Sequence, residues 1–392
     1  MNQFEYDVVI VGQGLNGLVS AQAVSDLGLK VLIIDRTNIK NENLKRSDTR
    51  TVAISEGSKI LLDKFGIWRE ISRYTQPIEK IKVIDRTPNR KIDFFNSNKE
   101  NNLGYIIKNS VFKNSIIKIL KTKKNISIIN EIELKKINYD SNFIISKFNK
   151  GYAKAKLLIA ADGKKSKVRD ILETPTINKS YNESALVVNF EHSKNHDNCA
   201  YEFFFENGPL ALLPMKKEKN HQSSLVWSNN KNLLKKYLDC NEDLLAKLIE
   251  EKILGTLGKI KKIKSKQIFP LSAHINYDFY DKNVIYVGDS AHSIHPIAGQ
   301  GWNLGLRDIS NLYNLLQEYK ALGIDIDSIN FTKNYHDRCF YDAFRMFQVT
   351  DKLNKLFMKK SYILNLSRAL GFDFIEHSPK VKKNITNFAM GF

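Results

Sequence analysis

Near the N-terminus, the stretch Asp7-Val-Val-Ile-Val11 runs directly into Gly12-Gln13-Gly14-Leu15-Asn16-Gly17. The first run is short, apolar and β-branched, which is typical of a buried strand, and a helical spacing of apolar residues follows over 18–24. A second apolar run, 31–34, then leads to Asp35. Strand, glycine turn, helix, strand and terminal acid in this order predict a Rossmann-type unit that binds a dinucleotide.

Each glycine of the turn has its own predicted role. Gly12 allows the tight turn, Gly14 lets a pyrophosphate approach the backbone, and Gly17 lets the helix pack closely on the strand. The N–H groups at the start of the helix favour an anion, and Asp35 stands where a ribose hydroxyl would bind. These residues alone leave open whether the nucleotide is FAD or NAD.

Two weaker signals follow. Arg50 precedes a helical pattern that stops at Gly66, and its guanidinium could reach a diphosphate, although a solvated loop arginine is an equal alternative. Further on, the buried run 157–161 ends at Asp162 and Gly163, which is either a second nucleotide contact or an ordinary turn.

The most specific stretch begins at 283–287, a predicted strand that ends in Gly288-Asp289. It continues through a loop over 295–301 and enters a helix rich in small residues. These features predict a second anion site, remote in sequence from Gly12, and a flavin would account for both sites. Asp289 is then expected at the ribityl or diphosphate region, and the Gly299-Gln300-Gly301 loop at the isoalloxazine ring.

Composition narrows the class of protein. The 392 residues are 42% apolar and 26% charged, which is an ordinary globular balance, and the formal net charge is +19. The basic residues are spread along the chain, and no nucleic-acid-binding motif is present, so we expect no nucleic-acid partner. The three cysteines have no metal-ligand spacing, and no metal site is expected. No stretch reaches 18 uncharged apolar residues, so a cytoplasmic chain, or one peripheral to the inner membrane surface, is expected.

With these motifs, the whole chain resembles the flavin-dependent aromatic hydroxylases of the para-hydroxybenzoate hydroxylase fold, and most closely their ubiquinone-biosynthesis branch. The family's Asp-x-Arg-x-x-Ala-x-Ser element matches 48–55, and its Asp-Gly motif matches Asp162 and Gly163. The segments 103–105, 208–214 and 388–391 resemble stretches particular to the ubiquinone branch, whereas Lys108 stands where that branch commonly has glutamate. The family's Gly-Asp and His-Pro-x-x-Gly-Gln-Gly-x-Asn elements match Gly288, Asp289, His295, Pro296, Gly299, Gln300, Gly301 and Asn303.

The resemblance implies an FAD-dependent monooxygenase that uses NAD(P)H and O₂ to hydroxylate the ring of a polyprenylated phenol. It also implies that Asp35 binds the ribose, that Arg50 binds the FAD diphosphate, and that other proteins of ubiquinone biosynthesis are partners. We expect Pro296 and the loop after it to form the wall beside the flavin ring. His295, or the nearby His292, could relay a phenol proton, but structural roles for both are the more ordinary reading. Another FAD oxidoreductase of the superfamily, such as a prenyl reductase or a halogenase, is the alternative.

The predicted fold class is α/β, with a Rossmann-like FAD-binding domain, an inserted, mostly β substrate domain and C-terminal helices. The FAD-binding domain is expected to comprise 1–75, 100–175 and 275–330, with 76–99 and 176–274 in the substrate domain and 331–392 as the helical segment. Within the substrate domain, 208–214 reads either as an apolar wall for a prenyl chain or as a core strand. In the last segment, Phe340, Phe344 and Phe347 share one helix face, and the basic residues Arg338, Arg345, Lys352 and Lys355 lie elsewhere. That helix is expected to pack on the protein, with docking on a membrane or a partner as the alternative.

Overall fold

The computed structural model describes residues 3–37, 48–87, 89–95, 102–216, 221–358 and 361–391. Its first sheet has the strand order β17-β18-β11-β1-β2-β8. The central strands β1 (Gln3–Val11), β2 (Val31–Asp35), β8 (Ile126–Asn130), β11 (Tyr152–Ala160) and β18 (Val284–Tyr286) are parallel. The antiparallel pair β9 (Leu134–Asp140) and β10 (Phe143–Phe148) branches from the start of β11, and β17 (Tyr280–Asp281) pairs with β18 at one end of the sheet. The strand, glycine turn and helix predicted for 7–24 are confirmed by β1 and by α1 (Leu15–Asp26).

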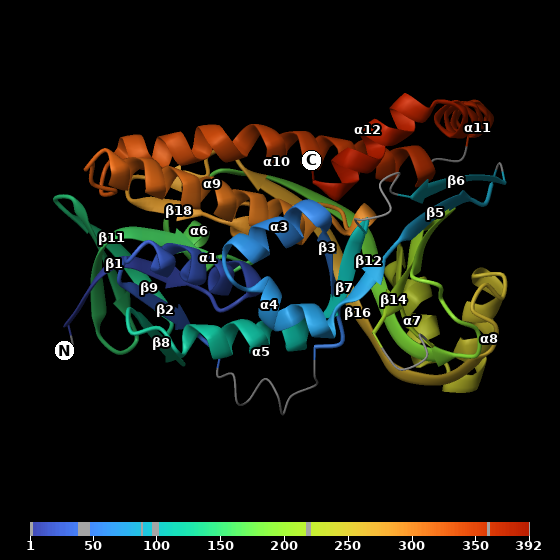
Figure 1. Cartoon of the computed structure of the whole chain (residues 1–392), viewed down its shortest axis with the longest axis horizontal. Helices are drawn as coiled ribbons and strands as arrows, with labels where there is room; N and C mark the ends of the chain where they lie inside the picture. Colours follow the sequence, from blue (N-terminus) through green and yellow to red (C-terminus); the bar gives the residue numbers. More distant parts are fainter. Residues whose placement is uncertain are drawn as a thin grey trace.

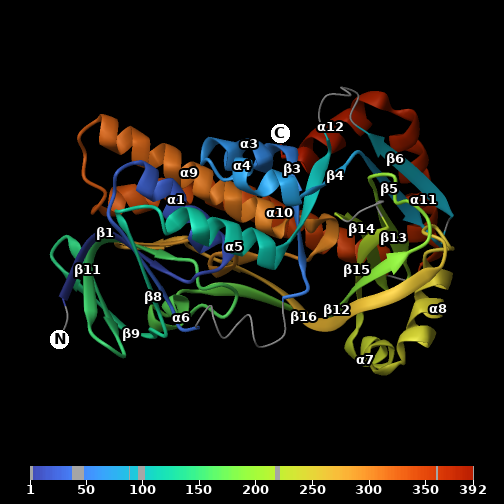
Figure 2. The ribbon, with the colours of Figure 1, turned by 60° about the horizontal axis from the view of Figure 1, so that its bottom comes forward.

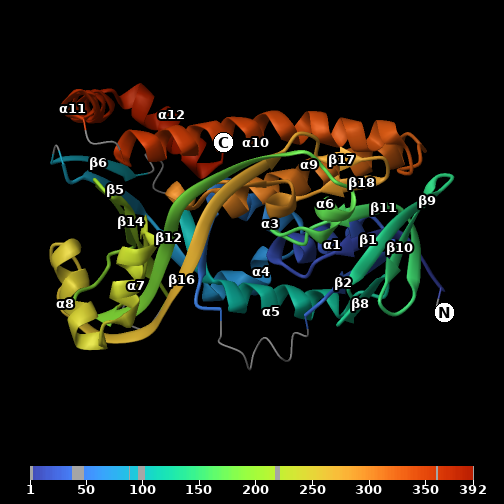
Figure 3. The same cartoon turned by 180° about the vertical axis from the view of Figure 1, so that it is seen from behind.

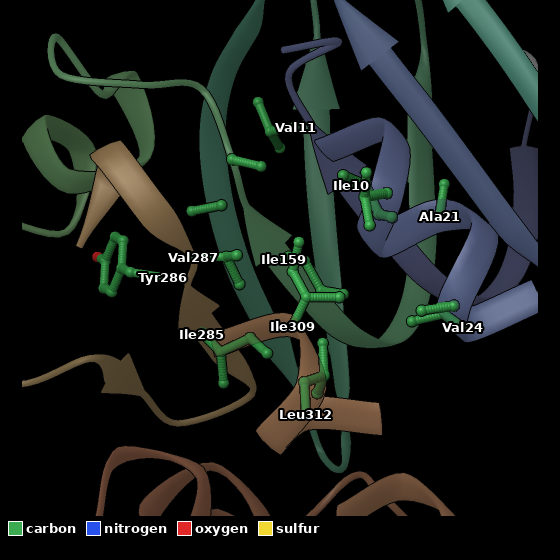
Figure 4. Packing of buried hydrophobic residues seen from close by; sticks show 14 of the residues in the cluster. Ile10, Val11, Ala21, Val24, Ile159, Ile285, Tyr286, Val287, Ile309 and Leu312 are labelled. Carbon is green, nitrogen blue, oxygen red and sulfur yellow. The ribbon is translucent and has the colours of Figure 1, made fainter. Parts of the chain in front are cut away.

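The largest core lies between this sheet and its helices. Ile10 of β1 and Ile159 of β11 are fully buried, as are Ile309 and Leu312 of α9 (Gly301–Ala321). Figure 4 shows these side chains meeting those of α1, Ala21 and Val24, in one packed layer. Helix α5 (Asn109–Leu120) packs beside α1. Strands that are covered on both faces explain why 8–11 and 157–160 are continuous apolar runs rather than alternating ones.

The second sheet has the order β19-β16-β12-β15-β14-β13-β5-β6. Its two longest members, β12 (Thr176–His192) and β16 (Ile260–Asn276), run side by side from the first sheet into the second half of the molecule (Figure 3). The others are β5 (Lys80–Asp85), β6 (Arg90–Phe95), β13 (Cys199–Phe205), β14 (Gly208–Met215), β15 (Gln222–Asn230) and β19 (His292–Ser293). One face is covered by α7 (Lys231–Asp239) and α8 (Glu242–Lys252), which share a second core with it.

A third, three-stranded sheet lies between the two halves (Figure 2). It consists of β3 (Thr51–Ser55), β7 (Gly104–Lys108) and β4 (Gln76–Ile78). Around it lie the helices α3 (Glu56–Lys64) and α4 (Trp68–Ile71), and the 3₁₀ turn η1 (Ser72–Tyr74) follows. Residues 76–78 therefore pair with 104–106, whereas the boundary predicted from sequence placed them in the substrate domain.

The C-terminal segment is helical, as predicted, and consists of α10 (Ile329–Met358), α11 (Tyr362–His377) and α12 (Pro379–Met390). Helix α10 runs beside α9, and α11 and α12 lie over β6 (Figure 1). Phe347 is buried, and Phe340 and Phe344 pack against the first core, so the predicted apolar face of α10 is turned inward. Two of the four basic residues are ion-paired, Arg338 with Glu318 and Lys355 with Asp351.

Candidate functional site

The parallel strands of the first sheet end together at one side, which we call the carboxyl edge. β1 ends at Val11, β2 at Asp35, β11 at Ala160 and β18 at Tyr286, and neighbouring strands pair in register up to these residues. The turns that follow carry the predicted site residues Gly12, Gly14, Asp35, Asp162 and Asp289. Ligands of open α/β sheets bind outside the carboxyl ends of the strands, so this edge is the candidate site.

Two glycines of the turn lie against other backbone atoms of the protein, and the third is open to solvent. Gly12 has a φ of +112°, and a Cβ on Gly17 would lie 2.1 Å from the carbonyl oxygen of Gly12. Both residues are therefore glycine because of contacts within the protein. Gly14 is different, since it is exposed and a Cβ there would lie 3.9 Å from its nearest neighbour, the oxygen of Ala161. It is also the N-cap of α1 and caps no N–H with a side chain, so the helix N-terminus is open to an anion.

Asp35 is held against this turn. One carboxylate oxygen accepts a 2.6 Å hydrogen bond from the backbone N–H of Gln13, and the other accepts bonds from the N–H and hydroxyl of Thr37. The side chain of Gln13 donates to Asn130 at the end of β8. Asp35 is thus oriented beside the turn, and the oxygen bonded to Gln13 keeps one lone pair for a ribose hydroxyl.

Two cations face an acid at the middle of the edge. Arg50 makes a two-point contact with Asp48, with both nitrogen to oxygen distances 2.8 Å, and Asn109 also donates to Asp48. The hydrogen bonds to Asp48 raise the pKa of Arg50, and the charge of Asp289 acts in the same direction. Burial lowers the pKa of Lys164, which Asp289 opposes. Asp289 itself is exposed, yet desolvation by the surrounding protein raises the pKa of its carboxyl. The site therefore offers the cations Arg50 and Lys164 and the hydrogen-bond acceptor Asp289 to the same ligand.

Asp162 supports the loop after β11. One of its oxygens accepts hydrogen bonds from the N–H groups of Lys167 and Val168 at the start of α6 (Lys167–Ile171). The other oxygen is buried without a hydrogen-bond partner among the described residues, and burial raises the pKa of this carboxyl. Arg169 donates to His274, to Ser290 and to Lys164, which ties the loop to the second sheet.

The loop before α9 lies at the far end of the site. Pro296 precedes the 3₁₀ turn η4 (Ile297–Gly299), and Gly299 has a φ of +62°. Helix α9 then begins at Gly301 without a side-chain cap, as α1 does. The amide of Asn303 is bonded to Ser55, Ala53 and Gly299, and Gln300 donates to Ala389. The side chain of Asn303 therefore positions the loop, and its contact with the cofactor stays a prediction.

Both histidines of this region are buried and have protein partners. His292 Nε2 lies 2.7 Å from Asp308, which also accepts the N–H of Gly288. His295 Nε2 lies 3.4 Å from Glu183 on β12, so its ring is directed at the second sheet. These contacts favour the structural reading of both histidines, and they hold the segment that precedes Pro296.

Sequence reasoning missed two contributors to this site, Asn16 and Lys164. A Cβ on Gly288 would lie 1.8 Å from Asn16, and a Cβ on Gly305 would lie 2.6 Å from the same amide. Asn16 therefore packs α1 onto both α9 and the Gly288 turn, which no local pattern signals. Lys164 follows the Asp-Gly pair directly, and a basic residue next to a phosphate-binding turn is the signal that could have found it.

The residues fit FAD. The open N-terminus of α1 and Gly14 suit a diphosphate, and Asp35 suits the ribose beside it. The N-terminus of α9 suits the ring of a reduced flavin, which carries negative charge near N1. Asp162, with its unpartnered oxygen, and the exposed Asp289 follow β11 and β18, the two strands on one side of β1 in the sheet.

Comparisons with known proteins agree with this reading. A family described as an FAD binding domain matches residues 5–321. The chain is 28% identical to the ubiquinone hydroxylase UbiL of Rhodospirillum rubrum, covering 98% of this chain and 89% of that protein. It is 28% identical to the mitochondrial ubiquinone biosynthesis monooxygenase COQ6 of Homo sapiens, covering 98% and 92%.

Solved structures share the fold. The p-nitrophenol 4-monooxygenase PnpA of Pseudomonas putida superposes with a TM-score of 0.77 at 18% identity, covering 100% of this chain and 98% of that one. PqsL of Pseudomonas aeruginosa, in complex with 2-aminobenzoylacetate, superposes with a TM-score of 0.75 at 17% identity, covering 91% and 97%. The predicted α/β fold class is confirmed.

Proposed function

The chain belongs to the FAD binding domain family, and from this premise we propose that it hydroxylates the aromatic ring of a polyprenylated phenol in ubiquinone biosynthesis. NAD(P)H and O₂ are the co-substrates. The observation that carries the proposal is the pair of helix N-termini that no side chain caps, those of α1 and α9. One long flavin nucleotide uses both, because its diphosphate and its reduced ring are the two places where it carries negative charge.

The protein's own residues bind and orient the cofactor. Gly14 and the first turn of α1 bind the diphosphate with backbone N–H groups, Arg50 and Lys164 add positive charge, and Asp35 binds the ribose. When bound, FAD accepts a hydride from NAD(P)H and, once reduced, delivers one oxygen atom of O₂ to an electron-rich ring. The α9 N-terminus stabilises negative charge on the reduced ring, and Pro296 with Gly299 to Gly301 forms the wall that excludes water there.

Contact with a membrane surface is part of the proposal, because a polyprenylated substrate resides in a bilayer. Among the described residues no helix combines the length and apolarity that crossing a bilayer requires. Helix α11 nevertheless exposes Leu366, Leu370 and Phe374 at 51%, 62% and 62%. Their spacing of four places them on one face, which we call the α11 stripe.

Charge favours a lipid partner for the α11 stripe. Lys380 and Lys383 of α12 and Lys91 of β6 are exposed on elements that contact α11, and the chain carries a net charge of +19. An apolar helix face bordered by lysines binds anionic lipid surfaces through burial and charge together. Arg338 and Lys355 of α10 are paired with acids and are weaker candidates for lipid contact.

The experiment that tests this function removes the protein from its host and identifies the quinone precursor that accumulates. We expect a polyprenylated phenol that lacks one ring hydroxyl, and the empty ring position identifies the carbon that the protein hydroxylates. Return of the wild-type gene should restore the product, whereas Gly14→Val should not, because its side chain would occupy the diphosphate position. A precursor with all ring hydroxyls but an altered prenyl tail would instead support a prenyl reductase.

A further inference from the structure

One face of the second sheet points towards the cofactor site. Along β12, β15, β14 and β13, the side chains of every second residue pack against α7 and α8, and those between them lie on the other face. Asn189 on this other face donates to the carbonyl of Thr49, next to Arg50, and Glu183 meets His295, next to Pro296. Both contacts come from loops that bear predicted site residues, so this face is the natural floor of a substrate site.

A single carboxylate lies in the middle of this floor. Strand pairing places one residue from each of six strands in a row across the face: Val187, Val226, Ala211, Glu202, Val83 and Ile92. We call this the Glu202 row. Its other members are apolar and small or medium in size, so no bulky side chain of the row stands beside the carboxylate.

The Glu202 row is not closed by protein packing. Val226, Ala211, Glu202 and Val83 keep part of their surface accessible, although they occupy the centre of an eight-stranded sheet. On the opposite face of the same strands, Phe203 and Leu210 are fully buried. Central strands that are closed on one face and partly open on the other indicate space for a ligand on the open face.

Aromatic and apolar residues border the row on both sides. Towards the α9 loop, Ala200 packs in a cluster with Ile106 and Met390 that also contacts Ala53, and a Cβ on Gly299 would lie 3.2 Å from Ala53. On the other side, Phe204 stacks on Phe357 of α10 at 3.6 Å between ring centroids. Glu202 thus lies between the loop predicted to meet the flavin ring and the helices that cover β13.

Within the described residues, the Glu202 carboxyl has no side-chain hydrogen bond or ion pair, and the neighbouring charged groups are directed elsewhere. On β5 and β6, Lys82 and Asp93 lie in register with Tyr201, on the opposite face. The charged residues of β5 and β6 that share the face of Glu202 are ion-paired, Asp85 with Arg368 of α11 and Arg90 with Asp373. On α10, Asp351 is paired with Lys179 and Lys355. β14 carries no charged residue.

We propose that Glu202 binds the phenolic hydroxyl of the aromatic substrate and accepts its proton, which makes it a catalytic residue of the hydroxylation. The inference rests on the proposed function and adds the place where the ring binds. In this step the phenolic O–H bond breaks, the proton passes to a carboxylate oxygen of Glu202, and the electron pair remains on the phenolic oxygen. The ring becomes more electron-rich, as attack on an oxygen atom from O₂ requires. The proton returns to the phenolate oxygen of the product before release.

The environment suits a general base that works near neutral pH. Desolvation alone raises the pKa of Glu202 from 4.5 to about 8, so the acid and base forms are both populated under physiological conditions. A base matched to the working pH transfers protons most effectively, typically by factors of roughly 10²–10⁴. An ordinary exposed glutamate is too weak a base for a phenol, whereas a desolvated one is closer to it in pKa.

The test compares holoenzyme of the wild type, Glu202→Gln and a control, Glu242→Gln, on the exposed first turn of α8. With a prenylated phenol, we expect wild-type kcat to rise with pH through an apparent pKa near 8. Glu202→Gln should lower kcat by roughly 10²–10⁴-fold, with a much smaller change in KM, and should abolish that pH dependence. Glu242→Gln should match the wild type.

A stability readout is independent of turnover. Because the folded-state pKa of Glu202 lies above 4.5, its contribution to stability is complete at low pH and is lost as pH rises towards 8. The unfolding temperature of Glu202→Gln, relative to that of the wild type, should therefore increase from about pH 5 to about pH 8. The corresponding difference for Glu242→Gln should stay constant. An active wild type whose pH profile is retained in Glu202→Gln would overturn the role of Glu202 and leave the proposed function standing. A wild type that hydroxylates no phenol would overturn both.

Discussion

Glycines at the carboxyl edge serve two physical purposes. Gly12 and Gly17 approach other backbone atoms so closely that any side chain would collide with the protein itself. Gly14 meets nothing within 3.9 Å, and its φ of −67° is accessible to any residue. No contact with the described part of the protein requires glycine at position 14. A glycine of this kind at the uncapped start of a helix indicates that a ligand occupies the space beside it.

This difference predicts opposite phenotypes for two alanine substitutions. Gly17→Ala should destabilise the protein by about 1–3 kcal/mol, because its Cβ would lie 2.1 Å from the Gly12 oxygen. Gly14→Ala should leave the unfolding free energy of the FAD-free protein within about 0.5 kcal/mol of the wild type, but should weaken FAD binding strongly. Urea unfolding and the ratio of bound FAD to protein measure the two effects. Stoichiometric FAD in Gly14→Ala would show that the diphosphate lies elsewhere.

At the scale of elements, the C-terminal helices hold the second sheet through a buried ion pair. Arg368 of α11 and Asp85 of β5 are 4% and 1% exposed and lie 3.0 Å apart. The apolar cluster of Ile92, Phe204, Phe357 and Phe372 surrounds this contact. A buried pair stabilises little relative to an apolar pair, yet losing one partner leaves an uncompensated charge.

Arg368→Met should therefore cost roughly 3–5 kcal/mol of unfolding free energy, and the double variant Arg368→Met with Asp85→Leu should recover most of it. Desolvation already raises the pKa of Asp85, so in the single variant the deficit should shrink as falling pH neutralises this carboxyl. Denaturant unfolding at several pH values measures both effects. Equal stability of the single and double variants would show that the charge of Asp85 is not the cause.

The α11 stripe gives the second prediction at this scale. Replacing Leu366, Leu370 and Phe374 with serine should abolish sedimentation with anionic liposomes, and the unfolding temperature should hardly change because the three side chains are exposed. Wild-type binding should weaken as salt screens the lysines. A control with Tyr341→Ser, which is 74% exposed on α10, should bind as the wild type does. Liposome binding unaffected by the triple serine variant would exclude the stripe.

For the whole molecule, the sequence predicted those features that depend on residues close together in the chain. The unit from β1 to Asp35 follows from strand runs and glycine spacing, and the α/β class follows from it. The order of the second sheet could not be predicted, because β13 pairs with β5 more than a hundred residues earlier. For the same reason Glu202 carried no signal, since its row exists only once six strands are in register. Asn303 was placed at the cofactor by its motif, whereas the fold uses its amide to join α9 to β3.

In the proposed reaction, the two halves of the chain bring FAD and a phenol together so that one oxygen atom of O₂ enters the ring. The most direct measurement supplies purified protein, NAD(P)H and a prenylated phenol with ¹⁸O₂, and determines the product mass. We expect one heavy oxygen atom per product molecule, with one NAD(P)H consumed for each when the reaction is coupled. A product whose new oxygen comes from water, or a reaction that proceeds without O₂, would contradict this expectation.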